Sequence, residues 1–427
     1  MNSNSLKISN ENLKRRLNAE RRFKFYGVIA ISLALIFVLI LFTNIISKGY
    51  SAFYRTLIEI KIEFNDKVQP EMFKQMSDTE INKLDLYSFS KKNIYSNFPD
   101  IEKKSDKKKI IKLFSIEFEE EIKTYINKNK NNLGNTINLY ISASDDIDQI
   151  HKGNYSRDIP EERRRVSNFQ LSIYDELVGQ NKVKFEFNFP FFSRGDSREA
   201  ELAGLGGSLI GSFFTMIIVL LLSFPFGLFG AIYLEEFSKR NRFTDFIEIN
   251  INNLAAVPSI VFGLLGLGIL LNTFELPRST ALVGGITLSL MTLPTIIIAT
   301  RASLRSVPPS IREGALAVGA SKVQTVMHHV VPLALPGSIT GTIIGIARAL
   351  GETAPLLLIG MVAFIVDVPS SPLDPSTSLP VQAYLWNDSA ERAYEEKTSA
   401  AIIILLSFLI LFNLIAVFIR RKFETKW

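Results

Sequence analysis

Positions 205–234 read LGGSLIGSFFTMIIVLLLSFPFGLFGAIYL, without a charged side chain. About 20 apolar residues in a helix are enough to cross the hydrocarbon core of a bilayer. The alternative is a buried helix of a large soluble protein, but such helices rarely stay uncharged over so long a stretch. We therefore interpret positions 205–234 as a membrane span.

Five further stretches have the same character, and together the stretches predict an all-α polytopic membrane protein with six transmembrane helices. The stretch at 255–271 is the shortest and contains Pro258. A cleavable signal peptide is the alternative for the first stretch, but its apolar run is too long and no small-residue cleavage pattern follows it. The five stretches lie at 25–46, 255–271, 281–300, 338–366 and 400–419.

The composition supports this arrangement and narrows the chemistry. Mean hydropathy is +0.19 although 21% of the residues are charged, so apolar and charged residues occupy separate blocks. The absence of cysteine excludes disulfides and thiolate metal sites. The histidines His151, His328 and His329 are not spaced with carboxylates as metal ligands are, and no phosphate-binding glycine-rich loop occurs. We expect no metal, cofactor, enzyme active site or nucleic acid partner, and we expect His328 and His329 on the surface, a pH switch being the alternative.

The basic residues beside the spans predict the orientation, because cytoplasmic loops of membrane proteins are enriched in Lys and Arg. Basic residues precede the first span and follow the second, fourth and sixth spans, which are all on one side of a six-span chain. We therefore expect a cytoplasmic tail at 1–24, an anchor helix at 25–46 and both termini in the cytoplasm. The residues concerned are Lys14, Arg15, Arg16, Arg21, Arg22, Lys24, Lys239, Arg240, Arg242, Arg301, Arg305, Arg312, Arg420, Arg421 and Lys422.

The insert at 47–204, between the first two spans, is predicted to form a small α+β domain outside the cytoplasm. Apolar and polar residues alternate at three places in it, which is typical of half-buried strands. Positions 109–129 have the period of an amphipathic helix, and the charge run at 103–109 predicts a solvated loop. We expect His151 at the surface, and a binding or docking role of the insert stays open. The alternating sets are Ile58, Ile60, Ile62 and Phe64; Ile137, Leu139 and Ile141; and Val183, Phe185, Phe187 and Phe189.

The segment at about 305–333 is either a passive connector or a docking element. Pro308 and Pro309 suit the start of a helix. Glu313 would then stand in the first turn, where a carboxylate meets the positive end of the helix dipole. Gly319 can make a sharp turn into a second helix. These features favour a rigid helix–turn–helix knob that fits a cleft on another protein.

The predicted fifth span carries two charges, Arg348 and Glu352, one helical turn apart. Arg348 lies about 18 Å along a helix from Pro336, near the middle of a bilayer. An arginine there costs about 2.5–3.5 kcal/mol on insertion scales, so it needs a partner. Either the pair locks two spans together, or Arg348 lines a path for an oxyanion, because guanidinium is planar, charged and bidentate. In the second case Glu352 holds Arg348 in place, and Thr353 is the third residue of the path.

Small residues recur every four positions in the same span, and this pattern permits close packing of helices. Their partner is either a second permease subunit or another span of this chain. The residues are Gly337, Gly341, Gly345 and Ala349.

The helix–turn–helix segment resembles the EAA loop of ABC importer permeases, the loop that docks onto the ATPase subunit. The Glu-Ala-Ala of the motif corresponds to the three residues that begin at Glu313. Gly319 corresponds to the glycine of the motif, and Pro332 corresponds to its final proline. The sequence departs from the motif at Gly314, and His329 and Val331 replace the usual isoleucine and leucine, while the spacing is kept. The docking residues that the resemblance implies are Glu313, Gly314, Ala315, Gly319 and Ala320.

The residues RALGETAP at 348–355 resemble a stretch of the PstA-type permease of the high-affinity phosphate ABC importer. Two further stretches, NLAAVPSIVFG at 253–263 and TRASLRSVPP at 300–309, are also similar to that family. The Ala-Pro ending favours the PstA type over the PstC type. The resemblance implies a permease domain at 205–427 with a core of five helices, whereas the long insert departs from the family pattern.

This resemblance implies a subunit of an ATP-driven importer in a bacterial inner membrane that forms a path for inorganic phosphate with a sister PstC-type permease. It also implies a dimer of cytoplasmic ATPase subunits and an extracytoplasmic phosphate-binding protein as partners. Another oxyanion is the alternative substrate. A membrane sensor would need a cytoplasmic signalling domain, for which we expect too few residues after the last span. An ion-coupled transporter would have internal repeats and no docking loop.

Overall fold

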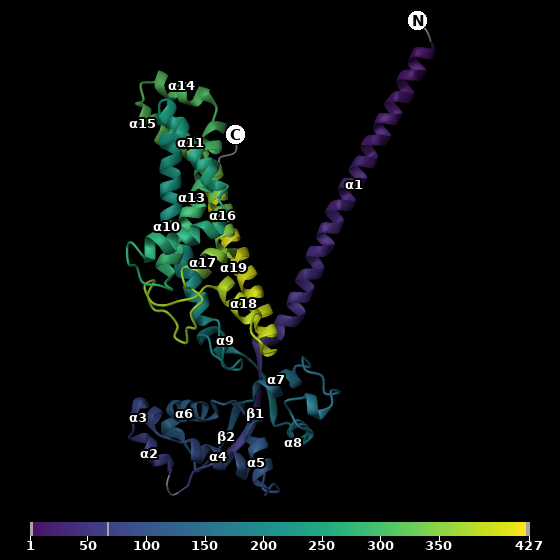
Figure 1. The fold of residues 1–427 in the computed structure, drawn as a ribbon, viewed down its shortest axis with the longest axis vertical. Helices are drawn as coiled ribbons and strands as arrows, with labels where there is room; N and C mark the ends of the chain where they lie inside the picture. Colours follow the sequence, from purple (N-terminus) through teal and green to yellow (C-terminus); the bar gives the residue numbers. More distant parts are fainter. Residues whose placement is uncertain (1–2, 66–67, 424–427) are drawn as a thin grey trace.

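The chain has two parts, a bundle of long apolar helices and a sheet-containing domain that lies below the bundle in Figure 1. The computed structural model describes residues 3–65 and 68–423, so the ends of the predicted tail (1–2) and of the predicted permease domain (424–427) lie outside the described residues. Within that range five helices are long and apolar enough to cross a membrane, or six if one bent pair counts as a single span. The predicted fold class, an all-α membrane protein with a small α+β domain, is confirmed.

The straight spans of the bundle differ in how closely they pack. α10 continues into η4 (Tyr233–Phe237), whereas α15 (Lys322–Thr325) and η6 (Val326–Val330) lead into α16. Figure 1 shows α1 leaning away from the other helices and meeting α19 near its end. There an added Cβ on Gly49 would lie 2.6 Å from the Ser399 carbonyl carbon. The five helices are α1 (Ser3–Gly49), α10 (Gly206–Ile232), α13 (Ala281–Ser306), α16 (Val331–Gly351) and α19 (Ala393–Phe423).

The third predicted span, at 255–271, is one arm of a bent pair. α11 (Arg242–Ala255) meets α12 (Ser259–Leu265) and its continuation η5 (Gly266–Leu271) at 106°. Pro258 has an extended backbone directly before α12, and the residue before a proline avoids the helical conformation. At 1.5 Å per residue the arm from Ser259 is about 20 Å long, which is less than the roughly 30 Å hydrocarbon core.

The fifth predicted span, at 338–366, was placed too far along the chain. The continuous helix runs from Lys322 to Gly351, and Glu352 has an extended backbone. The short α17 (Ala354–Leu358) follows, and Gly360 ends it with a positive φ of 93°. A proline ring clashes with the carbonyl group four residues earlier, here that of Gly351, so Pro355 favours a break in the helix at this point.

The small residues of α16 pack against α13 of the same chain. An added Cβ on Gly337 would lie 2.1 Å from Ser303 Oγ, and one on Gly341 would lie 2.2 Å from Ala299 Cβ. Gly345 faces the next turn of α13, with 3.7 Å to Ile296. Of the two partners considered for this face, the structure therefore shows another span of the chain.

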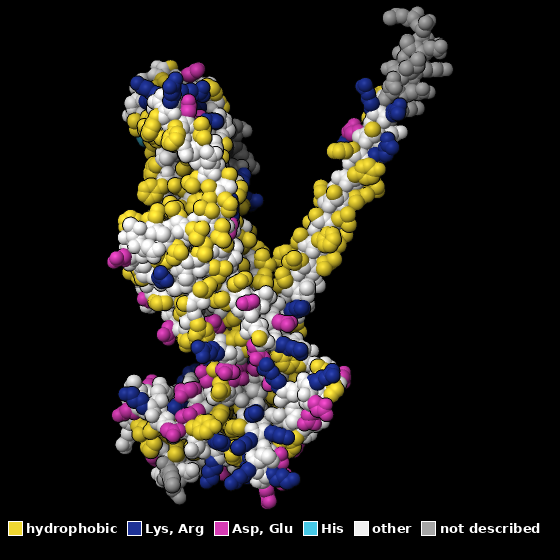
Figure 2. Space-filling view, in the orientation of Figure 1, with side chains coloured by type: hydrophobic (Ala, Val, Ile, Leu, Met, Phe, Trp, Pro, Cys, Tyr) yellow, Lys and Arg dark blue, Asp and Glu magenta, His cyan; other side chains and the backbone are white. Residues whose placement is uncertain are grey.

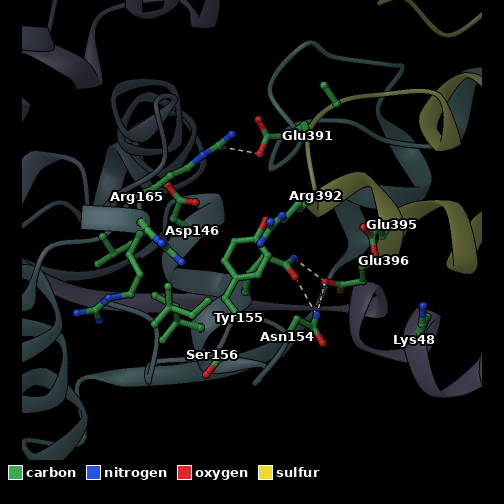
Figure 3. Close-up of a pocket in the computed structure, with 17 residues that line it drawn as sticks. Lys48, Asp146, Asn154, Tyr155, Ser156, Arg165, Glu391, Arg392, Glu395 and Glu396 are labelled. Atoms are coloured by element: carbon green, nitrogen blue, oxygen red, sulfur yellow. Dashed lines mark hydrogen bonds and ion pairs between the residues drawn. The ribbon is translucent and has the colours of Figure 1, made fainter. Parts of the chain in front are cut away.

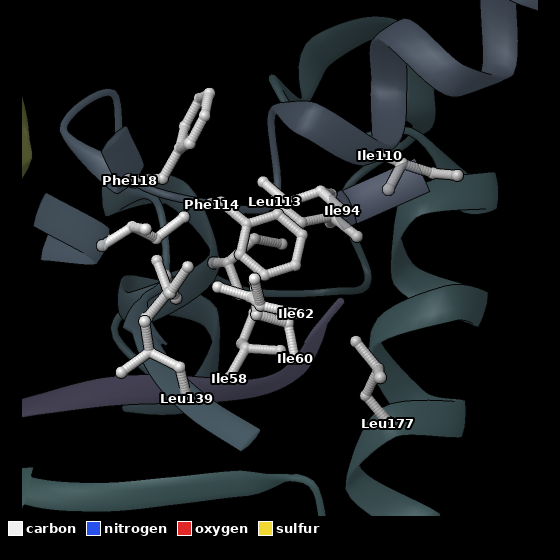
Figure 4. Packing of buried hydrophobic residues seen from close by; sticks show 14 of the residues in the cluster. Ile58, Ile60, Ile62, Ile94, Ile110, Leu113, Phe114, Phe118, Leu139 and Leu177 are labelled. Atoms are coloured by element: carbon white, nitrogen blue, oxygen red, sulfur yellow. The ribbon is translucent and has the colours of Figure 1, made fainter. Parts of the chain in front are cut away.

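The domain of the insert is built on a three-stranded antiparallel sheet with the order β2-β1-β3. The strands are β1 (Tyr54–Glu63), β2 (Thr136–Ser142) and β3 (Val183–Phe187). Ile58, Ile60 and Ile62 of the central strand are buried, as their alternation predicts, and Figure 4 shows them under side chains from the surrounding helices. The helices and helical turns of this domain are η1 (Tyr50–Phe53), α2 (Pro70–Lys74), α3 (Asp78–Lys83), α4 (Tyr87–Ser96), α5 (Lys104–Ile111), α6 (Phe118–Asn129), η2 (Lys130–Asn132), α7 (Asp145–His151), η3 (Glu161–Arg163), α8 (Asn168–Gly179) and α9 (Phe189–Ser193).

Two local predictions in this domain are wrong. The helix expected at 109–129 is divided into α5 and α6, because Phe114 between them forms a bridge with Ala143 beside the sheet and is buried. The charge run at 103–109, expected to be a loop, lies largely within α5. Its lysines face solvent from a helix, while the apolar end of α5 at Ile110 enters the core.

The apolar face of β3 was predicted to be buried, but its aromatic residues are exposed. Val183 is opposite Ile58 in the sheet, and Phe185 and Phe187 continue toward the end of the sheet that is nearer the bundle. The core cluster includes the part of β1 from Ile58 onward, so Phe185 and Phe187 lie beyond it. His151, expected at the surface, is half-buried and hydrogen-bonds to the Tyr174 hydroxyl. Burial lowers the pKa of its imidazole.

The chain enters the sheet domain and leaves it through two neighbouring segments. The backbone N–H of Asn188 donates to the carbonyl of Phe53 at 2.8 Å, so the first and last residues of the sheet domain lie side by side. The segment after α9 then turns into α10, and α18 (Leu379–Asn387) packs beside α19.

Substitution Gly341→Leu should destabilise the bundle, because the new side chain has no room against Ala299. Overpacking of this kind costs about 1–3 kcal/mol. The matched control is Gly268→Leu, since nothing lies within 4 Å of a Cβ at Gly268. We expect a lower Tm for Gly341→Leu than for the control when both detergent-purified chains are melted. Equal Tm values would contradict the close α13–α16 contact.

Candidate translocation site and docking loop

Two broken helices meet inside the bundle, next to the residues predicted for a transport path. α16 stops at Gly351 and resumes as α17, while α12 begins after the bend at Pro258. The two breaks are in contact, since an added Cβ on Gly263 of α12 would lie 2.7 Å from Pro355 Cα. Irregular backbone at membrane depth is tolerated where protein covers it or where it lines a cavity. α12 thus covers one side of the break in α16.

Arg348 and Glu352 lie at this break. Arg348 is in the last turn of α16, and its Nε is 3.6 Å from Glu352 Oε1. Their side chains are 46% and 22% exposed. Both residues belong to the end of one helix, so the pair does not join two spans. Thr353 is half-buried beside them, and its carbonyl accepts the first hydrogen bond of α17, from the Leu357 N–H.

The electrostatics of the break leave Arg348 available to a ligand. A cation near the C-terminal end of a helix is stabilised by the helix dipole. The 3.6 Å separation from Glu352 exceeds a normal hydrogen-bond distance. Within the described residues, the guanidinium group of Arg348 makes no hydrogen bond. It is therefore oriented by Glu352 and keeps its donors free.

The segment at 305–333 forms the predicted helix–turn–helix, but Glu313 lies in the second turn of its first helix and not in the first turn, because that helix begins at Pro309. α14 (Pro309–Ala317) is followed by Gly319 and then by α15. The φ of Gly319 is 89°, in the left-handed region that favours glycine. The Ser321 side chain accepts from the Gln324 N–H, and the Gln324 side chain accepts from the Ser321 N–H, so a capping box fixes the start of α15. The knob projects from the end of the bundle opposite the insert (Figure 1).

The exposed surface of this knob differs in part from the predicted docking set. Glu313, Gly314 and Gly319 are exposed and Ala320 is half-buried, but Ala315 is buried beneath α14. The structure adds four exposed apolar side chains that the sequence analysis missed. Apolar residues flanking a glycine turn would have been the signal for them. They are Leu316, Val318, Val323 and Met327, and Val318 is 86% exposed.

Arg312 anchors the knob to the bundle. Its guanidinium donates to Glu236 at 2.6 Å and to the carbonyls of Val307 and Leu304 at 2.7 and 2.8 Å. The Glu236 side chain is 8% exposed, so this is a largely buried charge pair. Breaking such a pair by removing one partner is strongly destabilising. The contact therefore holds α14 at a fixed position beside the end of α10.

Two further arginines, which the sequence analysis considered only as markers of orientation, also have carboxylate partners. Arg301 reaches Glu235 at 3.2 Å and Glu248 at 2.5 Å, and Arg305 reaches Glu235 at 2.8 Å. Glu235 follows the apolar run of α10 directly, which was the available signal for a partner. These contacts link the ends of α10 and α13 to the middle of α11.

The insert is joined to the bundle by a buried polar cluster at the start of α19. Lys152 of the insert donates to Glu396 at 2.8 Å, and Gln149 and Asn154 donate to the same carboxylate at 2.5 and 3.0 Å. Lys397 is buried and donates to the carbonyl of Ala203 at 2.6 Å. Among residues 3–65 and 68–423, no three His, Asp or Glu side chains are arranged to hold a metal ion.

Curated relatives are similar to part of the chain. "Probable ABC transporter permease protein YqgI" of Bacillus subtilis is 34% identical over 40% of this chain and 58% of its own length. "Phosphate transport system permease protein PstA 1" of Mycobacterium tuberculosis is 34% identical over 39% of this chain and 54% of its length. The chain thus spans about half the length of these relatives. The PstA protein of Haemophilus influenzae is 28% identical over 55% of this chain and 81% of its length.

Family and structure comparisons cover both parts of the chain. A domain described as "Domain of unknown function (DUF3333)" matches residues 10–161. A chain of the MetNI methionine ABC transporter, in an inward-facing conformation, is similar with a TM-score of 0.40 and 16% identity, over 52% of this chain and 95% of that chain. The family described as "Binding-protein-dependent transport system inner membrane component" matches residues 223–426. Residues 223–426 therefore belong to the inner membrane components of binding-protein-dependent transport systems, and PstA permeases are among the homologues of the chain.

Proposed function

We propose that the chain is the permease subunit of an ATP-driven importer and that it forms, with a sister PstC-type permease, the membrane path for inorganic phosphate. The observation that carries this proposal is Arg348, half-exposed at a helix break with its hydrogen-bond donors free. The family match of residues 223–426 and the names of the PstA relatives support it. The remaining partners in this proposal are a dimer of cytoplasmic ATPase subunits and an extracytoplasmic phosphate-binding protein.

The proposed orientation puts the knob and both termini in the cytoplasm of a bacterium and the insert, at 47–204, outside the inner membrane. Figure 2 supports it, because Lys and Arg gather over the α14–α15 end of the bundle and along the part of α1 far from the insert. Between these basic ends and the insert, the helices are covered by hydrophobic side chains. An excess of Lys and Arg marks the cytoplasmic side of a membrane protein.

The chemistry of the path follows from the Arg348–Glu352 pair. A guanidinium group donates two parallel hydrogen bonds to an oxyanion. Glu352, 3.6 Å away, orients the arginine and also repels a bound anion. Repulsion weakens binding, and a path needs a site that the anion can leave as well as enter. Guanidinium alone does not distinguish phosphate from sulfate or molybdate, so another oxyanion is the alternative substrate.

Energy coupling in this proposal passes through the knob. The ATPase subunits contact the exposed surface around Gly319, which includes Glu313, Leu316 and Val318. Because Arg312 ties α14 to Glu236 at the end of α10, a displacement of the knob also moves α10. α16 follows the knob directly in the chain and carries Arg348 at its far end. Movement at the ATPase is thereby transmitted to the path, which opens to each side in turn.

Substitution Arg348→Leu should lower phosphate uptake by proteoliposomes that contain the complete complex. A hydrogen bond to a charged group is worth about 1.5–3 kcal/mol, which corresponds to a roughly 10- to 100-fold loss at 1.36 kcal/mol per factor of ten. The matched control is Arg240→Leu, an exposed arginine beyond α10. Competition by sulfate and molybdate in the unmodified complex tests the substrate. Normal uptake by an assembled Arg348→Leu complex would remove this residue from the path.

Substitution Val318→Glu should reduce co-purification of the ATPase subunit, because it introduces a charge into the exposed apolar part of the knob. Leu373→Glu is the control, since Leu373 is also an exposed apolar residue and lies outside the knob. We expect the ATPase to be retained by the control and lost from Val318→Glu in an affinity pull-down. Equal retention by both variants would exclude this surface as the docking site.

A further inference from the structure

A cavity of about 840 Å³ lies where the insert meets the bundle. Its walls come from three separate parts of the chain, namely the end of α1 at Lys48, the segment of the insert from Asp146 to Val166, and the residues around the start of α19. Figure 3 shows Arg392 and Tyr155 near the centre of the view, Arg165 reaching toward Glu391, and Lys48 at one side. No role in the proposed transport path involves this cavity.

The cations of the cavity are mostly unpaired. Within the described residues, the side chains of Lys48, Arg163 and Arg392 form no ion pair and no hydrogen bond, although all three line the cavity. Arg164 has a hydrogen bond only to the neutral side chain of Asn168, and its Nε is buried without a partner. Four positive groups, two of them adjacent in the sequence, are therefore available to a ligand.

The carboxylates of the cavity are mostly neutralised. Glu391 accepts from Arg165 at 2.5 Å, and Glu396 accepts from Lys152 at 2.8 Å. Burial raises the pKa of Asp146, so its neutral form is favoured relative to an exposed aspartate. Within the described part of the chain, the exposed Glu395 forms no ion pair. Among the described residues, the unpaired cations of the cavity, Lys48, Arg163, Arg164 and Arg392, therefore outnumber its unpaired carboxylates, Asp146 and Glu395.

The geometry points to a binding site for a phosphate group in this cavity, among the unpaired cations Arg163, Arg392 and Lys48 that line it. Arginine and lysine are the usual ligands of phosphate groups in proteins. Ligand pockets measure roughly 300–1,000 Å³, so the cavity has room for a phosphate group with an organic substituent. Tyr155 and Ile159 provide an apolar part of the wall for such a substituent.

Two sources could supply this phosphate group. Lys48 is in the last turn of α1, a candidate membrane span, so the cavity borders the level at which lipid headgroups would lie. The headgroup of an anionic phospholipid is one source, and free inorganic phosphate from the aqueous phase is the other. Either ligand would bridge the insert and the start of α19, since the arginines that contact it come from both.

The test uses the full-length chain in lipid nanodiscs. All variants carry Arg348→Leu, so that the proposed transport path does not contribute and the inference is tested separately from the proposed function. Calorimetric titration with inorganic phosphate in pure phosphatidylcholine discs measures the free anion. Native mass spectrometry after mixing with phosphatidylglycerol measures the retained lipid. The double variant Arg163→Gln/Arg392→Gln is compared with Arg157→Gln, an arginine that pairs with Asp175 and does not line the cavity.

We expect saturable binding of phosphate or retention of phosphatidylglycerol, at least tenfold weaker in the double variant and unchanged in the control. Phosphate binding identifies the free anion as the ligand, and lipid retention identifies the headgroup. If the double variant melts at a lower temperature than the control, the single variant Lys48→Gln, at an exposed position, replaces it in the comparison. Binding of neither ligand, or equal binding by the cavity variant and the control, would overturn the inference.

Discussion

Hydrogen bonding of the backbone is the constraint on which the bundle depends. A peptide group without a partner is costly in a hydrocarbon environment, so a membrane helix stays continuous unless protein or water covers its break. α16 ends at Gly351, where Pro355 favours a break, and α12 lies against that break through Gly263. α12 itself has this position because the chain bends by 106° at Pro258. The surroundings of Arg348 therefore depend on two prolines that are far apart in the sequence.

The charged residues at the α14 end of the bundle form a second, shared framework. Glu235 has contacts with Arg301 and Arg305, and its neighbour Glu236 has contacts with Arg312. One end of α10 thus binds both α13 and the knob. The apolar helices alone would permit small rotations about their axes, whereas these contacts specify how the helix ends are arranged. The exposed apolar residues around Gly319 are presented from this framework rather than from a free loop.

The features that could be predicted from the sequence are those that neighbouring residues determine. Uncharged runs predicted the spans, the alternation of Ile58, Ile60 and Ile62 predicted a strand, and Gly319 predicted a turn. The end of α16 was misplaced because a count of apolar residues ignores the effect of Pro355 on the backbone. The exposure of β3 could not be predicted, because it depends on how far the helices extend over the sheet.

The charge pairs show the same limit for the candidate site. Arg348 and Glu352 are one turn apart, so their proximity follows from helix geometry alone. Arg312 and Glu236 are 76 residues apart, and no local pattern identifies them as partners. Arg163 and Arg392 line one cavity only because the insert folds back onto the start of α19. Interactions between distant segments require the tertiary structure.

The adjacency of Phe53 and Asn188 has a consequence for how the bundle accommodates the sheet domain. Because one backbone hydrogen bond joins the entry and the exit of the sheet domain, the two ends of the domain lie as close together as the ends of a short loop between α1 and α10 would. Insertions are tolerated best where their ends lie close together at the surface. A whole domain is therefore accommodated at this point without separating the ends of the helices on either side.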